Sequence, residues 1–180
     1  MTRSKTAYSA GVGPLMPCVY TSPFPYYAQL LLKPDASEDE MVDYCLKRLR
    51  MLLDQETAPR DTAAIFLEPV LGEGGYVPAP PAFIRGIRDI CDEHGIVFVA
   101  DEIQSGFGRT GKMFAIEYSG VVPDLMTIAK GLTSGYVPMG AVLTSAAIHD
   151  AFMQGPEHVI ELFHGYTYSG HPLAAAAAIA

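Results

Sequence analysis

The sequence of 180 residues has no long hydrophobic run and no cluster of basic residues, and each absence excludes a class of protein. No stretch reaches the roughly 18 apolar residues that a membrane-spanning helix needs, and residues 1–17 lack the apolar segment of a secretory signal peptide. The formal net charge is −8. We therefore expect no membrane span and no sequence-independent binding of nucleic acid, which requires cationic patches.

Cysteine is scarce, and its spacing indicates the compartment. Cys18, Cys45 and Cys91 are far apart and form neither a CxxC pair nor a cluster with histidine, which favours a reducing environment. No two histidines lie at i, i+4 spacing with acidic residues beside them, so no metal site is predicted. We expect a cytoplasmic protein, with the mitochondrial matrix as the alternative because the true N-terminus is expected to be missing.

The residues that are present indicate a folded α/β protein. Hydrophobic residues make up 49% and charged residues 18% of the chain, which is typical of a globular protein. Residues 1–34 are rich in Pro, Gly and Tyr and predict irregular chain. Beyond them, short apolar runs at residues 62–67, 96–100, 125–129 and 140–144 alternate with helical patterns at 37–53, 81–94, 114–118, 146–153 and from 172 onward. This alternation predicts a parallel sheet flanked by helices.

Two of the predicted strands end on an ionisable residue. The run 96–100 is followed by Asp101, and the run 125–129 by Lys130. In open α/β sheets, ligands bind outside the carboxyl ends of the strands, so a carboxylate and an amine are expected to face one crevice. From spacing alone, the alternative is that both are ordinary strand-end residues that face water.

Three other motifs do not support the functions that they suggest. Residues 106–112 match part of a phosphate-binding loop, but Met113 occupies the position where that loop needs a hydroxyl for magnesium. The loop 72–75 does not open a helix, as a dinucleotide-binding fingerprint must. Ser105 does not lie in a GxSxG turn, so a hydrolase triad is weakly supported.

Several motifs together resemble the signature of the class III pyridoxal-phosphate-dependent aminotransferases. The resemblance extends from about Gly13 to the last residue and includes residues 68–75, 101–111, 123–125, 129–131, 138–141 and 164–172. It implies part of the large domain of a fold type I transferase, in which a mostly parallel sheet is flanked by helices.

The resemblance also implies roles for individual residues. Lys130 would bind pyridoxal 5′-phosphate through its amine and later move the proton of the substrate. Asp101 would pair with the pyridine nitrogen of the cofactor, Gln104 would lie near the phenolic oxygen, and Ile103 would pack on the ring face.

Two further residues would recognise other groups. Thr167 matches a threonine that, in homodimers of the family, reaches the cofactor phosphate of the neighbouring subunit. Glu73 matches a substrate-site glutamate of enzymes that accept both an ω-amine and glutamate, by pairing with an arginine from the C-terminal part; the alternative is a loop carboxylate in water. Glu68 is expected to anchor the loop rather than to perform chemistry.

The resemblance covers only part of the family's chain, which is more than twice this length. The phosphate-binding cup would precede residue 1, and the small domain would follow Ala180. Residues 1–180 are thus expected to form a partial large domain that is inactive alone, with uncovered sheet edges and apolar faces.

The implied function is transamination. The amino donor would be an ω-amino acid or related amine of the 4-aminobutyrate or β-alanine type, and the acceptor would be 2-oxoglutarate or pyruvate. The alternatives are a non-catalytic truncated remnant, or an aminomutase or decarboxylating aminotransferase of the same family.

Overall fold

A four-stranded sheet forms the centre of the computed structural model, which describes residues 6–30 and 35–180. Its order is β1-β4-β5-β6, with bounds β1 (Ala64–Leu67), β4 (Val97–Asp101), β5 (Leu125–Ile128) and β6 (Ala141–Thr144). β1, β4 and β5 are parallel, whereas β6 is antiparallel to β5. The prediction of an α/β fold with a mostly parallel sheet is confirmed.

The direction of β6 differs from the uniform parallel sheet that the alternation of elements predicts. A parallel connection needs a crossover, usually through a helix. The segment between β5 and β6 forms only the short 3₁₀ helix η4 (Lys130–Thr133) and turns. Without a crossover helix, the chain reverses direction and pairs beside β5.

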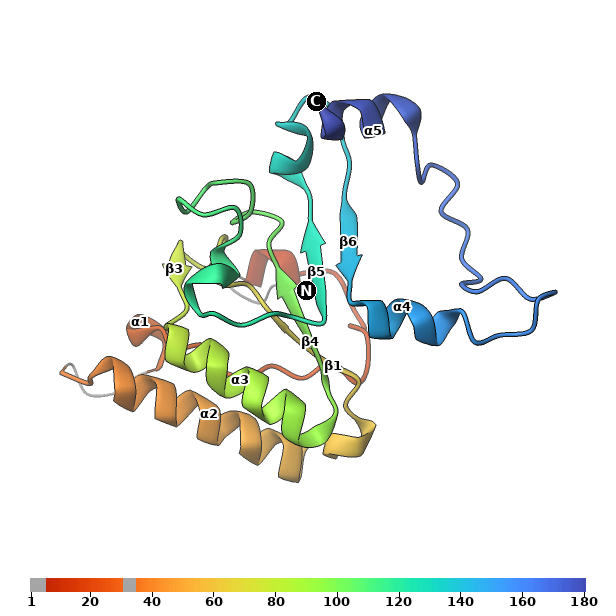
Figure 1. Cartoon of the computed structure of the whole chain (residues 1–180). Helices are drawn as coiled ribbons and strands as arrows, with labels where there is room; N and C mark the ends of the chain where they lie inside the picture. Colours follow the sequence, from red (N-terminus) through yellow and green to blue (C-terminus); the bar gives the residue numbers. More distant parts are fainter. Residues whose placement is uncertain (1–5, 31–34) are drawn as a thin grey trace.

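Two long helices, α2 (Glu38–Gln55) and α3 (Pro81–His94), lie side by side against one face of the sheet (Figure 1). The predicted capping box at the start of α2 is confirmed, because Ser37 Oγ accepts from Glu40 N while Glu40 Oε2 accepts from Ser37 N. α3 begins at a proline, which suits the first turn. It ends at Gly95 in the left-handed conformation, as the sequence predicts.

The core lies between these helices and the sheet. Gly86 allows the two helices to approach closely, because a Cβ there would collide with the side chain of Leu46. Phe98 of β4 is fully buried, which contributes roughly 2 to 3 kcal/mol. Burial raises the pKa of the Cys45 and Cys91 thiols to about 11, so both stay protonated at neutral pH. The helix residues predicted to face inward and found buried are Val42, Cys45, Leu49, Leu53, Phe83, Ile84, Ile87, Ile90 and Cys91.

The opposite face of the sheet is partly uncovered. Residues two apart on a strand share a face, so the strand register places Phe66 and Val142 on the same face as Asp101 and Thr127. Phe66 is 70% exposed and Val142 is 61% exposed. They belong to β1 and β6, the two edge strands of the described sheet. The expectation of uncovered edges and apolar side chains is confirmed.

Short elements complete the part before β4. The described residues of the N-terminal segment are irregular except for two short helices that the sequence did not predict, η1 (Thr6–Tyr8) and α1 (Tyr27–Leu30). Residues 1–5 and 31–34 of this expected irregular segment lie outside the described residues. The 3₁₀ helix η2 (Pro59–Asp61) precedes β1. The glycine-rich loop contains an unpredicted antiparallel hairpin of β2 (Val70–Leu71) and β3 (Val77–Pro78).

The C-terminal part forms an open arm. The 3₁₀ helix η3 (Ala115–Tyr118) precedes β5, and α4 (Ala146–Phe152) follows β6 with Ser145 as its cap, as predicted. Residues 153–171, here called the arm, extend away from the sheet before α5 (Pro172–Ile179) returns to contact η4 (Figure 1). Within the described ranges, none of the helices is both long enough and apolar enough to cross a membrane.

Asp124 joins α3, β4 and the start of β5. Its Oδ2 accepts from Arg88 Nη1 and from Phe98 N, both at 2.7 Å, and its own N–H donates to Phe98 O at 3.0 Å. Arg88 has a side chain only 15% exposed, and its guanidinium is paired with two carboxylates, Asp124 and Asp92, each at 2.7 Å. The interaction therefore helps to set the position of β5 relative to β4.

We expect Asp124→Ala to lower the free energy of unfolding by about 2 kcal/mol, because the change removes one of the two carboxylates paired with Arg88 and leaves the N–H of Phe98 without its acceptor. Urea denaturation followed by circular dichroism measures the effect. Asp43→Ala is the control: it removes an exposed pair with Lys47 and should cost less than about 0.5 kcal/mol. Equal losses in the two variants would contradict the structural role of Asp124.

Candidate active site

The pairing of β4 with β5 brings the predicted site residues to one edge of the sheet. Asp101 is the register partner of Thr127, and Glu102 N donates to Thr127 O at 2.9 Å. Lys130 follows three residues later, where β5 ends. Its Nζ donates to Gln104 Oε1 at 3.4 Å. The structure thus places Lys130, Gln104 and Asp101 at the carboxyl ends of two adjacent parallel strands.

The carboxylate of Asp101 is oriented by its own loop. Ile103 N donates to Asp101 Oδ1 at 3.0 Å, and both residues are half-buried. Within the part of the chain that the structure describes, Oδ2 accepts no hydrogen bond. The hydroxyl of Thr127, on the same face, is also buried without a partner there. One carboxylate oxygen and one buried hydroxyl therefore lack a hydrogen-bond partner among the described residues at this edge.

Gln104 lies between the lysine and the glycine-rich loop. Its Oε1 accepts from Lys130, and its Nε2 donates to Tyr76 Oη at 3.3 Å. A Cβ at Gly72 would lie 2.7 Å from Cδ of Gln104 and still closer to its oxygen. Glycine at position 72 thus provides the space that the amide of Gln104 occupies.

The glycine-rich loop is held from both sides. Glu68 Oε2 accepts from Gly72 N at 2.8 Å, which agrees with the expectation that Glu68 anchors the loop. Glu73 Oε2 accepts from the phenol of Tyr8 at 2.6 Å. This hydrogen bond and the nearby negative charge raise the pKa of Tyr8. A segment 65 residues upstream therefore holds Glu73, a contact that no sequence pattern predicts.

Glu102 is a residue that the sequence interpretation missed. It is fully buried, and its carboxylate accepts from Ser105 Oγ at 2.5 Å and from Ile116 N at 2.7 Å. The side chain thereby ties the end of β4 to η3 and closes the loop of residues 103–114. Ser105 is itself buried and engaged with a carboxylate, which gives no support to a nucleophilic role. The sequence signal that could have indicated this role is the position of Glu102 directly after a buried strand.

Strained backbone is concentrated around this edge. Tyr76, Phe107 and Lys130 have φ values of 56°, 59° and 45°, in the left-handed region that costs a non-glycine residue about 1 kcal/mol or more. A Cβ at Gly131 would lie 2.8 Å from Cβ of Phe107, so the loop and η4 touch closely. Such strain is found preferentially at functional sites.

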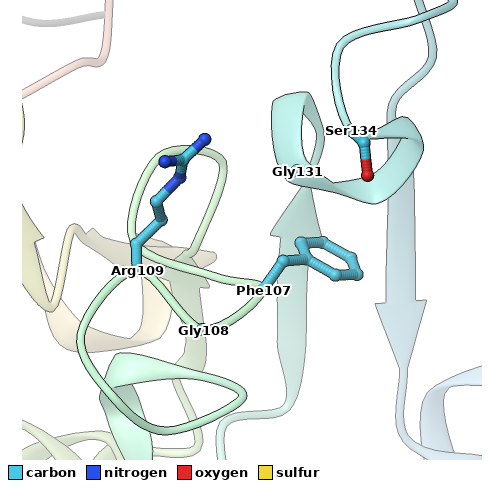
Figure 2. A pocket seen from close by; sticks show the side chains of 5 residues that line it. All are labelled: Phe107, Gly108, Arg109, Gly131 and Ser134. Carbon is cyan, nitrogen blue, oxygen red and sulfur yellow. The ribbon is translucent and has the colours of Figure 1, made fainter.

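A hollow of about 380 Å³ lies next to this contact and is lined by Phe107, Gly108, Arg109, Gly131 and Ser134. Figure 2 shows the Phe107 ring directed toward the turn that carries Gly131 and Ser134, while the Arg109 side chain extends away from them. Lys130 and Gln104 do not line the hollow. Lys112 of the same loop lies over the Tyr118 ring, and no helix begins there, which agrees with the rejection of a phosphate-binding loop.

Thr167 lies on the arm, five residues before α5, and is exposed. In the described ranges, no group of three or more His, Cys, Asp or Glu is arranged to hold a metal ion.

We expect Glu102→Ala to destabilise the fold by about 3 kcal/mol, because it leaves a buried N–H and a buried hydroxyl without their acceptor. Urea unfolding monitored by circular dichroism gives the free energy. Glu157→Ala, at an exposed position of the arm, should change it by less than about 0.5 kcal/mol. A loss of the same small size for Glu102→Ala would contradict the role assigned to this carboxylate.

Comparison with known proteins identifies the family. The model of the aminotransferase class-III family matches residues 1–180. A probable 4-aminobutyrate aminotransferase of Bacillus subtilis is 44% identical over 181 residues, covering 100% of this chain and 39% of that protein. A beta-alanine–pyruvate aminotransferase of Pseudomonas aeruginosa is 48% identical over 120 residues, covering 66% of this chain and 27% of that protein.

A solved structure supports the same assignment. An amine transaminase from an uncultivated Pseudomonas species, solved with pyridoxal phosphate bound, superposes with a TM-score of 0.85 and 37% identity over 97% of this chain and 39% of that one. The chain thus spans less than half the length of the relatives it matches. Because the family model matches every residue, as the sequence motifs predict, this chain belongs to the class-III aminotransferase family.

Proposed function

We propose that this chain carries the lysine and the carboxylate that hold pyridoxal phosphate in an enzyme transferring an amino group from an amine donor to a 2-oxo acid. The observation that carries the proposal is the amine of Lys130, hydrogen-bonded to Gln104 at the end of β5 and one strand away from Asp101. Membership of the class-III family supports it. In this proposal, residues 1–180 form part of a cofactor-binding large domain.

The groups at this edge fit the cofactor chemically. Pyridoxal phosphate supplies an aldehyde that condenses with an amine, with loss of water, and a protonated ring that takes up an electron pair from the substrate carbon. Lys130 provides the amine. Asp101 retains an oxygen with no hydrogen bond among the described residues and would pair with the ring nitrogen. Ile103 would supply an apolar contact to the ring face, and Gln104 an amide near the phenolic oxygen.

The residues of this chain would perform the proton transfer. With cofactor and substrate bound, Nζ of Lys130 would be the base that takes the proton from the substrate carbon bearing the amino group, and the acid that returns it. The bond from Gln104 Oε1 holds Nζ near the strand end. The carboxylate of Asp101 would pair with the ring nitrogen and favour the protonated ring.

The proposed donor is an ω-amino acid or related amine, and the proposed acceptor is 2-oxoglutarate or pyruvate. The names of relatives support both, since one is a probable 4-aminobutyrate aminotransferase and another a beta-alanine–pyruvate aminotransferase. Glu73, on the loop beside Gln104, is the proposed substrate-site residue.

A second copy of the chain is the proposed partner. The arm is exposed and carries large apolar side chains, among them Phe163 at 90% and Tyr168 at 85% exposure, which is typical of an interaction surface. Thr167 on this arm would then act at the cofactor site of the neighbouring subunit.

The central experiment adds pyridoxal phosphate to the purified chain. We expect a new absorbance band and, after borohydride reduction, a cofactor-modified peptide that contains Lys130, because Nζ is exposed and lies beside the amide that holds it. Lys130→Ala should abolish both signals.

Lys112→Ala is the matched control, since it removes an exposed lysine that contacts Tyr118 instead. It should leave both signals unchanged. Absence of a Lys130-dependent band in the unaltered chain would contradict the proposal that this chain attaches the cofactor.

Because residues 1–180 are expected to be inactive alone, the donor class is tested on a cofactor-loaded enzyme of full family length that contains this chain. Addition of 4-aminobutyrate or β-alanine should reduce the Lys130-dependent band, because the donor amine would take the place of Nζ. Glu73→Gln should slow this loss roughly tenfold or more if the carboxylate orients the donor. An equal rate for the unaltered protein and for Glu73→Gln would show that Glu73 does not orient the donor. It would not affect the assignment of Lys130.

A further inference from the structure

We propose that Tyr76 is a positioning residue that fixes the side-chain amide of Gln104, so that the amide oxygen faces and holds the amine of Lys130. This inference rests on the proposed function for its catalytic meaning, but the contact itself belongs to the cofactor-free chain. It is carried by two hydrogen bonds on opposite sides of one amide: from Lys130 Nζ to Gln104 Oε1 at 3.4 Å and from Gln104 Nε2 to Tyr76 Oη at 3.3 Å.

Elementary hydrogen-bond chemistry decides the orientation of the amide. A lysine ammonium has only donors, so the group that faces it must be the carbonyl oxygen of Gln104. The NH₂ group then points the other way and needs an acceptor. The phenol oxygen of Tyr76 is that acceptor. Without it, one of the two restraints on the amide is lost, and only the bond from Lys130 holds the amide in this orientation.

The surrounding backbone holds Tyr76 for this contact. Its φ of 56° lies in the left-handed region, which a tyrosine adopts only under restraint. The restraint comes from the β2–β3 hairpin and from the bond of Tyr76 N to Gly72 O at 3.2 Å. The residue is 72% exposed, so the phenol is held at Gln104 by this backbone position and by the hydrogen bond rather than by burial of the ring.

Gly72 completes the enclosure of the amide. A methyl group at this position would collide with the amide of Gln104. Since Gly72 does not have a positive φ, alanine fits the backbone itself, and the flexible end of Gln104 is what must move. Gly72→Ala therefore displaces the same amide while it keeps the phenol of Tyr76.

The contact can be tested without cofactor. In an NMR spectrum of the ¹⁵N-labelled chain, the side-chain amide of Gln104 is identified by its absence in Gln104→Ala. Tyr76→Phe removes only the phenol oxygen, and we expect the Gln104 amide proton signals to shift and to exchange faster with water. The amides of Gln29, Gln55 and Gln154 serve as internal references and should not move. An unchanged Gln104 signal would overturn the proposal.

A second experiment measures cofactor attachment. Tyr76→Phe should raise the apparent dissociation constant for pyridoxal phosphate about three- to tenfold, the effect of losing one hydrogen bond, and should alter the position of the Lys130-dependent band. Gly72→Ala should act in the same direction. Tyr44→Phe, on the exposed side of α2, is the matched control and should have no effect.

Measuring the effect of Tyr76→Phe both in the unaltered chain and in Gln104→Ala shows whether Tyr76 acts through Gln104. Once Gln104 is replaced by alanine, Tyr76→Phe should have no further effect on cofactor affinity. An equal effect in both backgrounds would overturn the proposed positioning role. If the unaltered chain forms no Lys130-dependent band, the proposed function fails, while the NMR result still decides whether Tyr76 orients Gln104.

Discussion

The arrangement of the candidate site depends on the parallel pairing of β4 with β5. β4 lies between β1 and β5, and its central residues Phe98, Val99 and Ala100 are almost completely buried. A strand buried on both faces has no freedom to slip, because a shift by one residue would turn its apolar side chains to the wrong face. The bond from Glu102 N to Thr127 O continues the ladder beyond the strand. As a result, Asp101 and Lys130 emerge at the same edge.

The loops beyond these strands are held by polar contacts as well as by the packing of Phe107 against Phe114. Glu102 joins the end of β4 to η3, Glu68 anchors Gly72, and Tyr8 holds Glu73. Strained backbone occurs in the same region, at Tyr76 and Lys130. Strain of this kind persists only where the surroundings over-determine it. The candidate site is therefore a set of restrained loops on a rigid sheet edge, with one amide, that of Gln104, between the lysine and the hairpin.

The elements predicted from sequence are those with a strong local signal. The capping box at Ser37, the stop at Gly95 and the cap at Ser145 each depend on neighbours within a few residues, so their physics is contained in the local sequence. The antiparallel direction of β6 and the β2–β3 hairpin were not predicted. Both depend on how a connecting segment folds back, and glycine-rich segments such as residues 72–75 allow several paths.

The sequence by itself determined the family, through the order and spacing of motifs that the family model matches over residues 1–180, and it identified Asp101 and Lys130 as strand-end residues. Only the tertiary structure decided which side chains surround them. Tyr8 reaches Glu73, Tyr76 reaches Gln104, and Glu102 turns inward to bind Ser105. These contacts join segments up to 65 residues apart. These contacts form only when strand register, helix packing and loop closure are all in place, so a local sequence pattern cannot predict them.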